Sequence, residues 1–379
     1  MGAFFDPDDR TVWSGMLSNV LDQLGRLGLQ TGYLDATPWP LATRAARRWL
    51  AATDRLGETW TLRAEMRAIT ALSNLTWRAR TMGGSSWWLH PAGAYGRPVS
   101  GKIISLAEIS PAQLVSMGTA MAGSFGLPGL TKRGLASVVR QQLRLHRKAS
   151  ACCVASRWAA HSLVQEHGIP ARKVHVIGYG RNIEVSPPPE RDWSEPHFLF
   201  VGNDWGRKNG DAVLRAFARL KKSCPGAQLD LVGNHPPVEL AGVTGHGRMA
   251  QGPFAFDEPE GRIGLARLFE KATCLVVPSL VEPFGIVYVE AAAAGIASIA
   301  TAIGGTADSV GAGGILVDPY DDLAIYSAMR HMADADTARS LGALAMERSA
   351  GFTWEKVAQR ILRAMGAPGI STSELAEFL

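Results

Sequence analysis

The chain has few cysteines and no long hydrophobic run. Four cysteines in 379 residues do not suggest a disulfide framework, so we expect reduced thiols and no metal site. The longest apolar stretch without a charge, Ala291 to Ile303, is too short to span a bilayer. No N-terminal segment pairs a basic region with an apolar core. We therefore expect no secretory signal and a cytoplasmic protein.

The sequence also lacks internal repeats and low-complexity segments, and its charge is unevenly distributed. The hydrophobic fraction of 46% and the charged fraction of 19% are typical of a globular protein. A chain of this length predicts two domains. Residues 1–180 carry 21 Lys and Arg against 10 Asp and Glu, whereas residues 181–379 carry 18 against 24. The basic half indicates an anionic partner.

In the second half, apolar strands alternate with helical segments. Helices are expected after residue 210, with Val213, Leu214, Phe217 and Leu220 on one face, and over Ile263–Lys271 and Phe284–Ala294. The expected strands are His197–Gly202, Leu229–Gly233, Val243–Gly247, Thr273–Pro278, Ala297–Ala302 and Ile315–Val317. This α/β alternation predicts a parallel sheet covered on both faces, with ligands at the carboxyl ends of its strands.

The first half predicts a similar but less regular sheet. Its expected strands are Met1–Phe5, Leu29–Leu34, Lys102–Leu106, Ala151–Ala155 and Lys173–Ile177, and its expected helices are Met16–Leu27 and Arg44–Arg80. The three prolines at 187–189 form a stiff connector. We therefore predict an N-terminal domain over 1–186, a C-terminal domain over 187–366 whose last helix crosses back to the first, and a tail over 367–379.

The segment from Glu282 to Glu290 carries the clearest chemical pattern. It follows an expected strand, and Pro283 favours a helix that begins there. The amides of residues 285–287 would then be unpaired donors at the positive end of the helix dipole, which suits a diphosphate. Glu290 would lie roughly 12 Å further along the helix. The two carboxylates could therefore hold hydroxyls at both ends of a nucleotide sugar.

Two further elements suit an anionic ligand. Arg207 and Lys208 lie in the turn that begins at Gly202, after the first strand of the second half. Arginine can clamp diphosphate oxygens with two donors, and lysine adds a point charge. Gly15, which follows Trp13 and Ser14, lets the backbone approach a phosphate or sugar without a side chain between them.

These motifs resemble those of glycosyltransferase family 4, the retaining enzymes of the GT-B fold, in which two Rossmann-like domains face each other across a cleft. The resemblance covers about residues 195–320, through FVGNDWGRKNG and VVPSLVEPFGIVYVEAAAAG. DPDDRTVWSG, ASRWAA and VHVIGYGRN extend it more thinly into the first half. It implies transfer of a hexose from a UDP- or GDP-sugar to an envelope lipid, a polysaccharide or a small metabolite, without a metal or other cofactor.

The resemblance also implies roles for matching positions. Arg207 and Lys208 would hold the donor diphosphate, Glu282 the donor sugar and Glu290 the ribose. The other positions expected to contact the donor are Gly15, Gly202, Phe284, Gly285, Ile286 and Val287, and residues 246–254 are expected near the base. The family often places His or Asp near the reacting sugar. Here the candidates are Glu108, which could equally cap a helix starting near Pro111, and His90, which could equally be a packed residue.

Two other functions fit the same residues. One is a nucleotide-sugar epimerase or hydrolase, which acts on the donor alone. The other is a catalytically silent relative that binds a nucleotide.

A row of basic residues lies on one face of a predicted helix. Arg133, Arg140, Arg144 and Arg147 recur at helical spacings. Such a face is typical of a solvated helix, and it also suits an anionic acceptor or peripheral contact with the anionic inner face of a membrane. No aromatic residues are interleaved with these cations, so nucleic acid is not an expected partner. The Ala-, Arg- and Trp-rich composition is typical of a high-GC bacterium.

Overall fold

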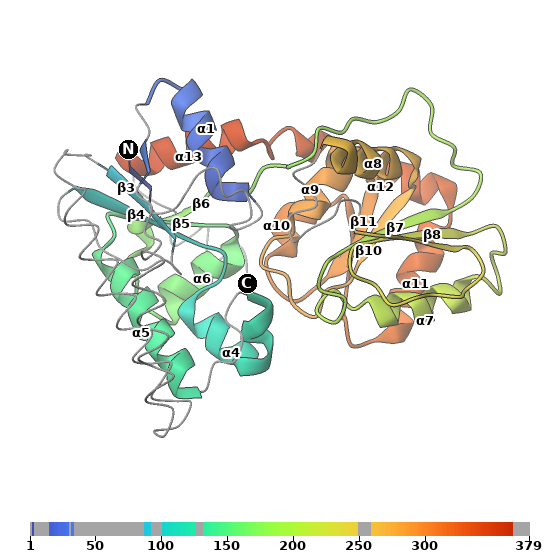
Figure 1. Ribbon diagram of the computed structural model, residues 1–379, viewed down its shortest axis with the longest axis horizontal. Coiled ribbons are helices and arrows are strands. Elements are labelled where there is room, and N and C mark those ends of the chain that lie inside the picture. Colours follow the sequence, from blue (N-terminus) through green and yellow to red (C-terminus); the bar gives the residue numbers. More distant parts are fainter. Residues whose placement is uncertain are drawn as a thin grey trace, which may run out of the picture. The chain divides into compact units, whose positions relative to one another are not determined.

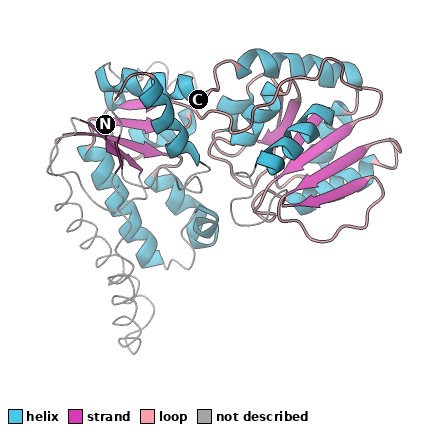
Figure 2. Ribbon diagram, turned by 45° about the horizontal axis from the view of Figure 1, so that its top comes forward, coloured by secondary structure: helices cyan, strands magenta, loops and turns pink. Residues whose placement is uncertain are grey.

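The computed structural model describes residues 2–3, 15–29, 32–33, 87–91, 101–125, 132–248 and 259–366. They form two compact units, each built on one sheet (Figures 1 and 2). The first unit contains the described residues up to Ile177, except Gly15 and Met16, together with the chain from Ala358. The second contains Gly15, Met16 and Gly178–Val357. None of the described helices combines the length and the apolar character needed to cross a bilayer.

The first unit has a six-stranded parallel sheet in the order β2-β1-β3-β4-β5-β6. The strands are β1 (Gly2–Ala3), β2 (Gly32–Tyr33), β3 (Trp87–Pro91), β4 (Lys102–Ala107), β5 (Ala151–Val154) and β6 (Val174–Val176). The helices are α1 (Met16–Arg26), α4 (Pro111–Ala122), α5 (Lys132–Lys148) and α6 (Arg157–Gln165), with 3-10 turns η3 (Gly123–Phe125) and η4 (Ala171–Lys173). The strands expected near residues 1, 29, 102, 151 and 173 are confirmed. The helix expected over Arg44–Arg80 lies outside the described residues.

Strand β3 was not predicted. Its sequence, Trp87–Pro91, shows no alternation of polar and apolar residues, and Trp88 to Pro91 are all buried. The continuous burial follows from its place between β1 and β4. Because a short segment of two tryptophans, leucine, histidine and proline fits a loop as well as a buried strand, only the sheet identifies it as a strand.

The interior of the first unit holds a buried histidine. His146, on α5, is fully buried, and its Nδ1 atom is 2.9 Å from the Ser105 hydroxyl of β4. Burial, together with smaller contributions from the neighbouring His167 and His90, lowers the pKa of His146 to about 4. Since the charged form is excluded from this site, the imidazole is neutral in the folded protein near neutral pH.

We predict that the first unit loses stability between pH 6.5 and 4. The unfolded histidine binds a proton below its usual pKa of about 6.5, whereas folded His146 stays neutral until about pH 4. Unfolding therefore takes up a proton in this window, and stability falls as the pH falls, by up to about 3 kcal/mol. Urea unfolding at a series of pH values measures this slope. His146→Gln removes the titration and is expected to flatten the slope; an equal slope in both proteins contradicts the prediction.

The second unit has a six-stranded parallel sheet in the order β12-β11-β10-β7-β8-β9. The strands are β7 (His197–Val201), β8 (Gln228–Val232), β9 (Val243–Gly247), β10 (Cys274–Val277), β11 (Ala297–Thr301) and β12 (Gly314–Val317). The helices are α7 (Gly210–Leu220), α8 (Pro259–Lys271), α9 (Ile286–Ala293), α10 (Thr306–Val310), α11 (Asp322–Met332) and α12 (Ala335–Ser349). Helix α13 (Trp354–Gly366) begins in this unit and belongs to the first unit from Ala358 on. All six expected strands of this half are confirmed.

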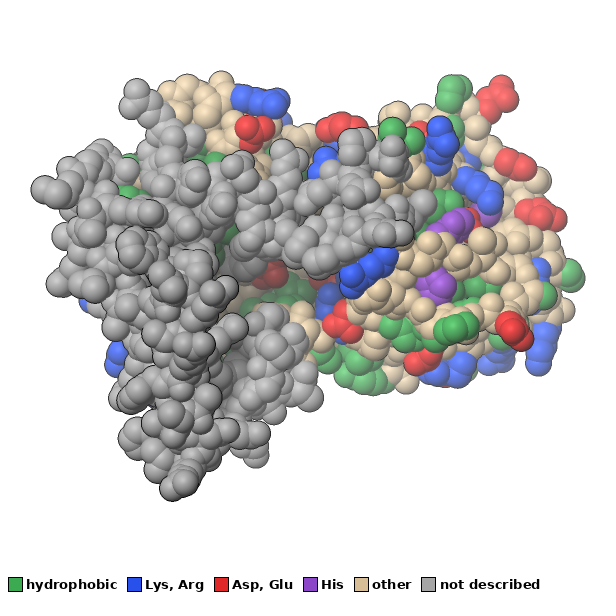
Figure 3. All heavy atoms as spheres, viewed as in Figure 1, with side chains coloured by type: hydrophobic (Ala, Val, Ile, Leu, Met, Phe, Trp, Pro, Cys, Tyr) green, Lys and Arg blue, Asp and Glu red, His purple; other side chains and the backbone are tan. Residues whose placement is uncertain are grey.

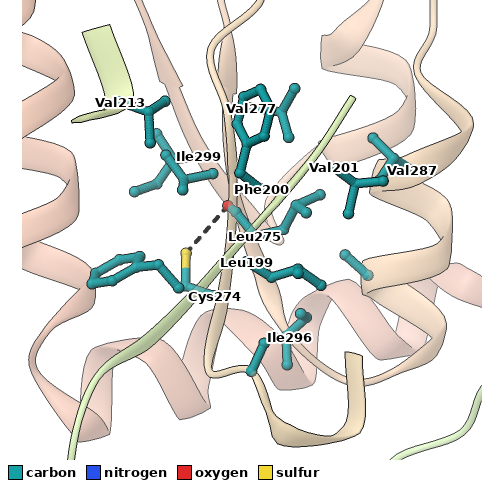
Figure 4. Close-up of a cluster of buried hydrophobic side chains, with 14 of the residues drawn as sticks. Leu199, Phe200, Val201, Val213, Cys274, Leu275, Val277, Val287, Ile296 and Ile299 are labelled. Carbon is teal, nitrogen blue, oxygen red and sulfur yellow. Dashed lines mark hydrogen bonds between the residues drawn. The ribbon is translucent and has the colours of Figure 1, made fainter. Parts of the chain in front are cut away.

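Helices cover both faces of this second sheet, as its apolar strands require. In Figure 1, α7 and α11 lie on one face and α8, α9 and α12 on the other. Figure 4 shows the resulting core, with Val213 of α7 and Val287 of α9 on opposite sides of β7 and β10. The Cys274 thiol is buried there and donates to the Leu275 carbonyl at 3.3 Å. All four cysteines are free thiols, as expected.

The chain enters the second unit before the three prolines. The predicted boundary at residues 186–187 lies inside this unit, which begins at Gly178. The cause is packing, because Ile183 and Val185 belong to the hydrophobic core of the second unit. Just beyond the prolines, the Arg191 guanidinium donates to the carbonyls that end α8 and to the Ala294 carbonyl after α9. A charged donor there satisfies helix-terminal acceptors that would otherwise be unpaired.

Candidate functional site

The backbone of Glu282 is fixed between two strand ends of the second sheet. Glu282 follows β10 and forms an isolated parallel bridge with Gly304, which follows β11. The Glu282 amide donates to the Ile303 carbonyl at 3.1 Å, and the Gly305 amide donates to the Glu282 carbonyl at 2.9 Å. Gly304 has a φ of 119°, and a Cβ atom on it would lie 2.1 Å from the Glu282 carbonyl oxygen. Only glycine fits this approach.

The Glu282 carboxylate is buried between two cations. Its Oε2 atom accepts from Lys208 Nζ at 2.5 Å, from Arg207 Nη1 at 3.2 Å and from the Ser279 hydroxyl at 3.3 Å. The residue is 7% exposed. Burial alone would raise the pKa of Glu282, but the charges of Lys208 and Arg207 and their hydrogen bonds outweigh burial, and the pKa falls to about 2. The carboxylate is therefore ionised throughout the physiological range.

The turn after β7 positions both cations. The Asp204 side chain accepts from the Arg207 amide at 3.1 Å, and the Asp204 carbonyl accepts from the Lys208 amide at 2.8 Å. The Leu280 amide donates to the Arg207 carbonyl at 2.8 Å, which joins this turn to the loop that carries Glu282. Burial lowers the pKa of Lys208, although the charge of Glu282 opposes it. The three side chains, predicted from two separate motifs, therefore form one cluster at the carboxyl edge of the sheet.

Helix α9 begins later than predicted. It starts at Ile286, not near Pro283, because Gly285 adopts a left-handed φ of 82° and caps the helix. A Cβ atom on Gly285 would lie 2.3 Å from the Tyr288 ring. The Tyr288 amide donates to the Gly285 carbonyl at 3.1 Å. The amides of Ile286 and Val287 have no helical acceptor four residues earlier, so they are the first-turn donors that suit an anion.

Glu290 already has partners within the second unit. It is 6% exposed, and its Oε1 atom accepts from the Asn182 amide at 3.1 Å. Burial raises the pKa of Glu290 to about 7, although hydrogen bonds from the amides of Asn182 and Ile183 and the charge of Arg262 oppose the rise. No local sequence pattern indicates this contact with the chain near residue 182. The ribose role of Glu290 stays a prediction.

The remaining predicted donor positions lie in two places. Gly202 follows β7 directly, and a Cβ atom on it would lie 2.7 Å from Cγ of Lys208, so it lies against the cation turn. Phe284 is 1% exposed between Glu282 and the start of α9. Gly15 is buried immediately before α1, with a φ of 74° that favours glycine. Its phosphate contact stays a prediction, and Trp13 and Ser14 lie outside the described residues.

The candidates near the reacting sugar lie on the first sheet. His90, in β3, is 2% exposed, and its Nδ1 atom is 2.8 Å from the Pro91 carbonyl. Glu108 is half-buried just after β4, ahead of α4, which begins at Pro111. Neither catalytic assignment is tested. Of the residues expected near the base, His246 is bound to Asp230 at 2.7 Å, and residues 249–258 lie outside the described residues.

Two residues of the site were missed by sequence reasoning. Ser279 donates to Glu282, and Asp204 holds the cation turn. Ser279 follows β10 by two positions and Asp204 follows β7 by three. Polar residues just beyond parallel strands share one edge of the sheet. The position of Ser279 and Asp204 just beyond expected strands could therefore have identified both as site residues from the sequence.

The family model that matches this chain lies within the second unit. Residues 195–335 match the family described as "Glycosyl transferases group 1". The chain is 31% identical over 233 residues to D-inositol 3-phosphate glycosyltransferase 1 of Catenulispora acidiphila, which covers 54% of each chain. It is 34% identical over 232 residues to D-inositol 3-phosphate glycosyltransferase of Kribbella flavida, covering 54% of this chain and 53% of that protein. The matches thus span about half the length of these curated relatives.

Solved structures resemble the whole chain in fold. Sucrose-phosphate synthase from Thermosynechococcus elongatus superposes with a TM-score of 0.67 at 19% identity, covering 96% of this chain and 98% of that one. WaaG, a glycosyltransferase involved in lipopolysaccharide biosynthesis, gives a TM-score of 0.63 at 14% identity, covering 97% and 100%. With two parallel-sheet α/β units, the chain has the GT-B fold, and its segment from residue 195 to residue 335 belongs to the group 1 glycosyltransferases.

Proposed function

We propose that the chain is a retaining glycosyltransferase that takes a hexose from a nucleoside-diphosphate sugar. The observation that carries this proposal is the buried cluster of Glu282, Arg207 and Lys208 beside the N-terminus of α9. A sugar diphosphate requires a carboxylate that accepts from the sugar hydroxyls, and cations and first-turn helix amides that bind the phosphates. The match of residues 195–335 to group 1 glycosyltransferases supports the same function.

In the proposed reaction, the cations stabilise the charge that develops on the departing diphosphate. Arg207 and Lys208 are fixed before the donor arrives, so little reorganisation is needed during bond cleavage. Their two charges replace those of a metal ion, and we propose that the reaction needs none. The acceptor hydroxyl attacks the face from which the diphosphate leaves, and a donor phosphate oxygen takes its proton. The sugar therefore keeps its anomeric configuration.

We propose a non-protein acceptor that carries an anionic group. Two relatives are named for D-inositol 3-phosphate, a phosphorylated polyol. The basic first half of this chain fits an acceptor of that charge.

Thermal-shift measurements with UDP, GDP, ADP and dTDP test the donor site. A nucleotide that binds the folded protein raises its apparent melting temperature. The matching sugar nucleotide is then incubated with and without an acceptor panel that includes inositol 3-phosphate. A new glycoside that forms only with an acceptor supports transfer. Product without acceptor identifies an epimerase or hydrolase, and binding without turnover identifies a silent nucleotide-binding relative.

We also propose that the protein is cytoplasmic and that α5 contacts the anionic inner membrane surface. Arg140, Arg144, Arg147 and Lys148 are all exposed, and the helix contains no acidic residue. No ion pair occupies these four side chains among the described residues. Figure 3 shows the second unit differently, with cationic and anionic side chains intermixed on the visible face. An unpaired cationic face attracts acidic lipids.

Liposome flotation tests the membrane contact. We expect recovery with vesicles rich in phosphatidylserine and none with phosphatidylcholine alone. Changing Arg140, Arg144 and Arg147 to Gln should weaken binding by about two orders of magnitude, since each cation contributes about 1 kcal/mol. The control changes three exposed cations of the second unit, Lys222, Arg267 and Arg330, to Gln. Equal recovery with both lipids contradicts the proposed membrane contact.

A further inference from the structure

The chain passes between the two units twice, and the two crossings are bonded to each other. The first crossing lies between Ile177 and Gly178, and the second lies within α13, between Val357 and Ala358. On the first unit's side, Arg360 donates to the Ile177 carbonyl at 2.8 Å. On the second unit's side, the Trp354 indole N–H donates to Asn182 Oδ1 at 3.2 Å. The crossings therefore behave as one paired connection.

The contact between the crossings is too close for any other residue at position 180. A Cβ atom on Gly180 would lie 2.4 Å from the Trp354 amide nitrogen and 2.7 Å from the first carbon of its indole ring. One residue further, the Arg181 amide donates to the Phe352 carbonyl at 3.2 Å. Backbone therefore packs directly on backbone at this point, which leaves little room for the crossings to slide independently.

The first crossing is also bonded to α9, the helix whose N-terminus is the candidate diphosphate site. The Asn182 amide donates to Glu290, in the middle of α9, and the Ile183 amide also contacts this carboxylate. Asn182 therefore joins the first crossing to two helices: its backbone amide bonds to α9, and its side chain bonds to the start of α13. A shift of α9 along its axis would break the first of these bonds or carry the crossing with it.

An aromatic cluster joins the crossings to the loop before α9. The Tyr179 ring lies 5.4 Å from the Phe284 ring in an edge-on arrangement and 6.1 Å from the Trp354 ring. Phe284 also meets Phe352 at 5.9 Å. Phe284 lies between Glu282 and Gly285, so its ring is the side chain nearest in sequence to the start of α9. The Phe284 carbonyl accepts from the buried Ser309 hydroxyl at 2.6 Å, which also holds this loop.

We propose that Asn182, Tyr179 and Trp354 are positioning residues. They fix the N-terminus of α9, and the loop of residues 282–285 before it (the candidate donor loop), relative to the two crossings between the units. They act through Phe284 and Glu290 and do not themselves contact a substrate. Occupation of the donor loop and the conformation of the crossings are thereby coupled. The effect of this coupling on catalysis rests on the proposed function, whereas the contacts that link the crossings to α9 do not.

Hydrogen exchange of the unliganded full-length protein tests the linkage first. Trp354→Phe removes the indole N–H, and Asn182→Ala removes its acceptor while keeping the backbone amide that bonds to Glu290. Each variant is expected to speed exchange about five- to tenfold, the value of one hydrogen bond, in peptides covering 178–185 and also 284–290. Trp193→Phe, an aromatic change elsewhere in the second unit, is the control and should alter neither peptide. Faster exchange confined to residues 350–356 overturns the proposal.

A double-mutant cycle gives the second readout. Because both substitutions remove the same bond, the double variant should exchange no faster than either single variant, and additive effects contradict the linkage. With UDP, GDP or ADP, whichever raises the melting temperature of the wild type, each variant should raise the donor KM about fivefold at nearly unchanged kcat. A general loss of stability would not give this split. If none of these nucleotides binds the wild type, the proposed function fails, while the exchange result still decides the linkage.

Discussion

Replacing Glu282 with alanine is expected to abolish sugar transfer and to destabilise the second unit by about 3–5 kcal/mol. The substitution leaves the Lys208 ammonium and the Arg207 guanidinium largely buried, with their side chains 12% and 13% exposed, and without the carboxylate they share. An uncompensated buried charge costs far more than the pair contributed when intact. Lys208→Ala should also abolish transfer, because a cation of the proposed diphosphate site is lost.

A neutral substitution separates the electrostatic role of Glu282 from its structural role. Glu282→Gln keeps the shape and one acceptor, but it removes the negative charge that occupies both cations in the unliganded protein. We expect the glutamine variant to bind a free nucleoside diphosphate several-fold more tightly than the wild type, because the competing anion is gone. Its transfer rate should nevertheless fall at least about 100-fold, since the acid that orients the sugar is missing.

Calorimetric titration and a transfer assay on the same samples measure both effects. Arg215→Gln, which breaks an exposed ion pair with Asp322 on the same unit, is the matched control, and it should change neither quantity. Full transfer by both Glu282→Ala and Lys208→Ala refutes the site. Weaker nucleotide binding by Glu282→Gln means that the carboxylate assists the diphosphate cations instead of competing for them.

The sequence predicted the second sheet closely, because its strands are uniform apolar runs with turn residues at their ends. The exact start of α9 was not predictable, since Pro283 favours a helix start while the left-handed Gly285 delays it until Ile286. The Tyr288 ring occupies the space that a Cβ atom at position 285 would need, so this tertiary contact requires glycine there. Such tertiary packing leaves no mark in a local pattern.

The site was partly predictable for the same reason. Arg207, Lys208 and Glu282 each follow an apolar strand, so topology alone brings them to one edge. The partners of Glu290 were not predictable, because Asn182 is 108 positions away in a segment with no strand or helix of its own. Long-range contacts of irregular chain depend on how the finished units pack.

Gly304→Ala is expected to have the second largest effect on stability and transfer, although position 304 has no functional side chain. The added methyl would lie 2.1 Å from the carbonyl oxygen of Glu282, and the φ of 119° is one that residues with a side chain rarely adopt. The three nearest atoms all belong to the Glu282 backbone, so no flexible side chain can move aside. The strain and the required backbone shift together should cost about 4 kcal/mol of stability.

The loss of activity should exceed what this loss of stability explains. Gly304 forms the bridge that fixes the backbone of Glu282, so relief of the clash displaces the carboxylate from Lys208 and Arg207. A displacement of about 1 Å can cost roughly 100-fold in rate, and transfer per folded molecule should fall by that order. Gly247→Ala is the control for stability, because its φ of 61° is also left-handed but no atom lies within 4 Å of the added methyl; it should cost only about 1–2 kcal/mol. If Gly304→Ala is no more destabilising than this control and retains normal transfer, the Glu282 bridge does not position the site.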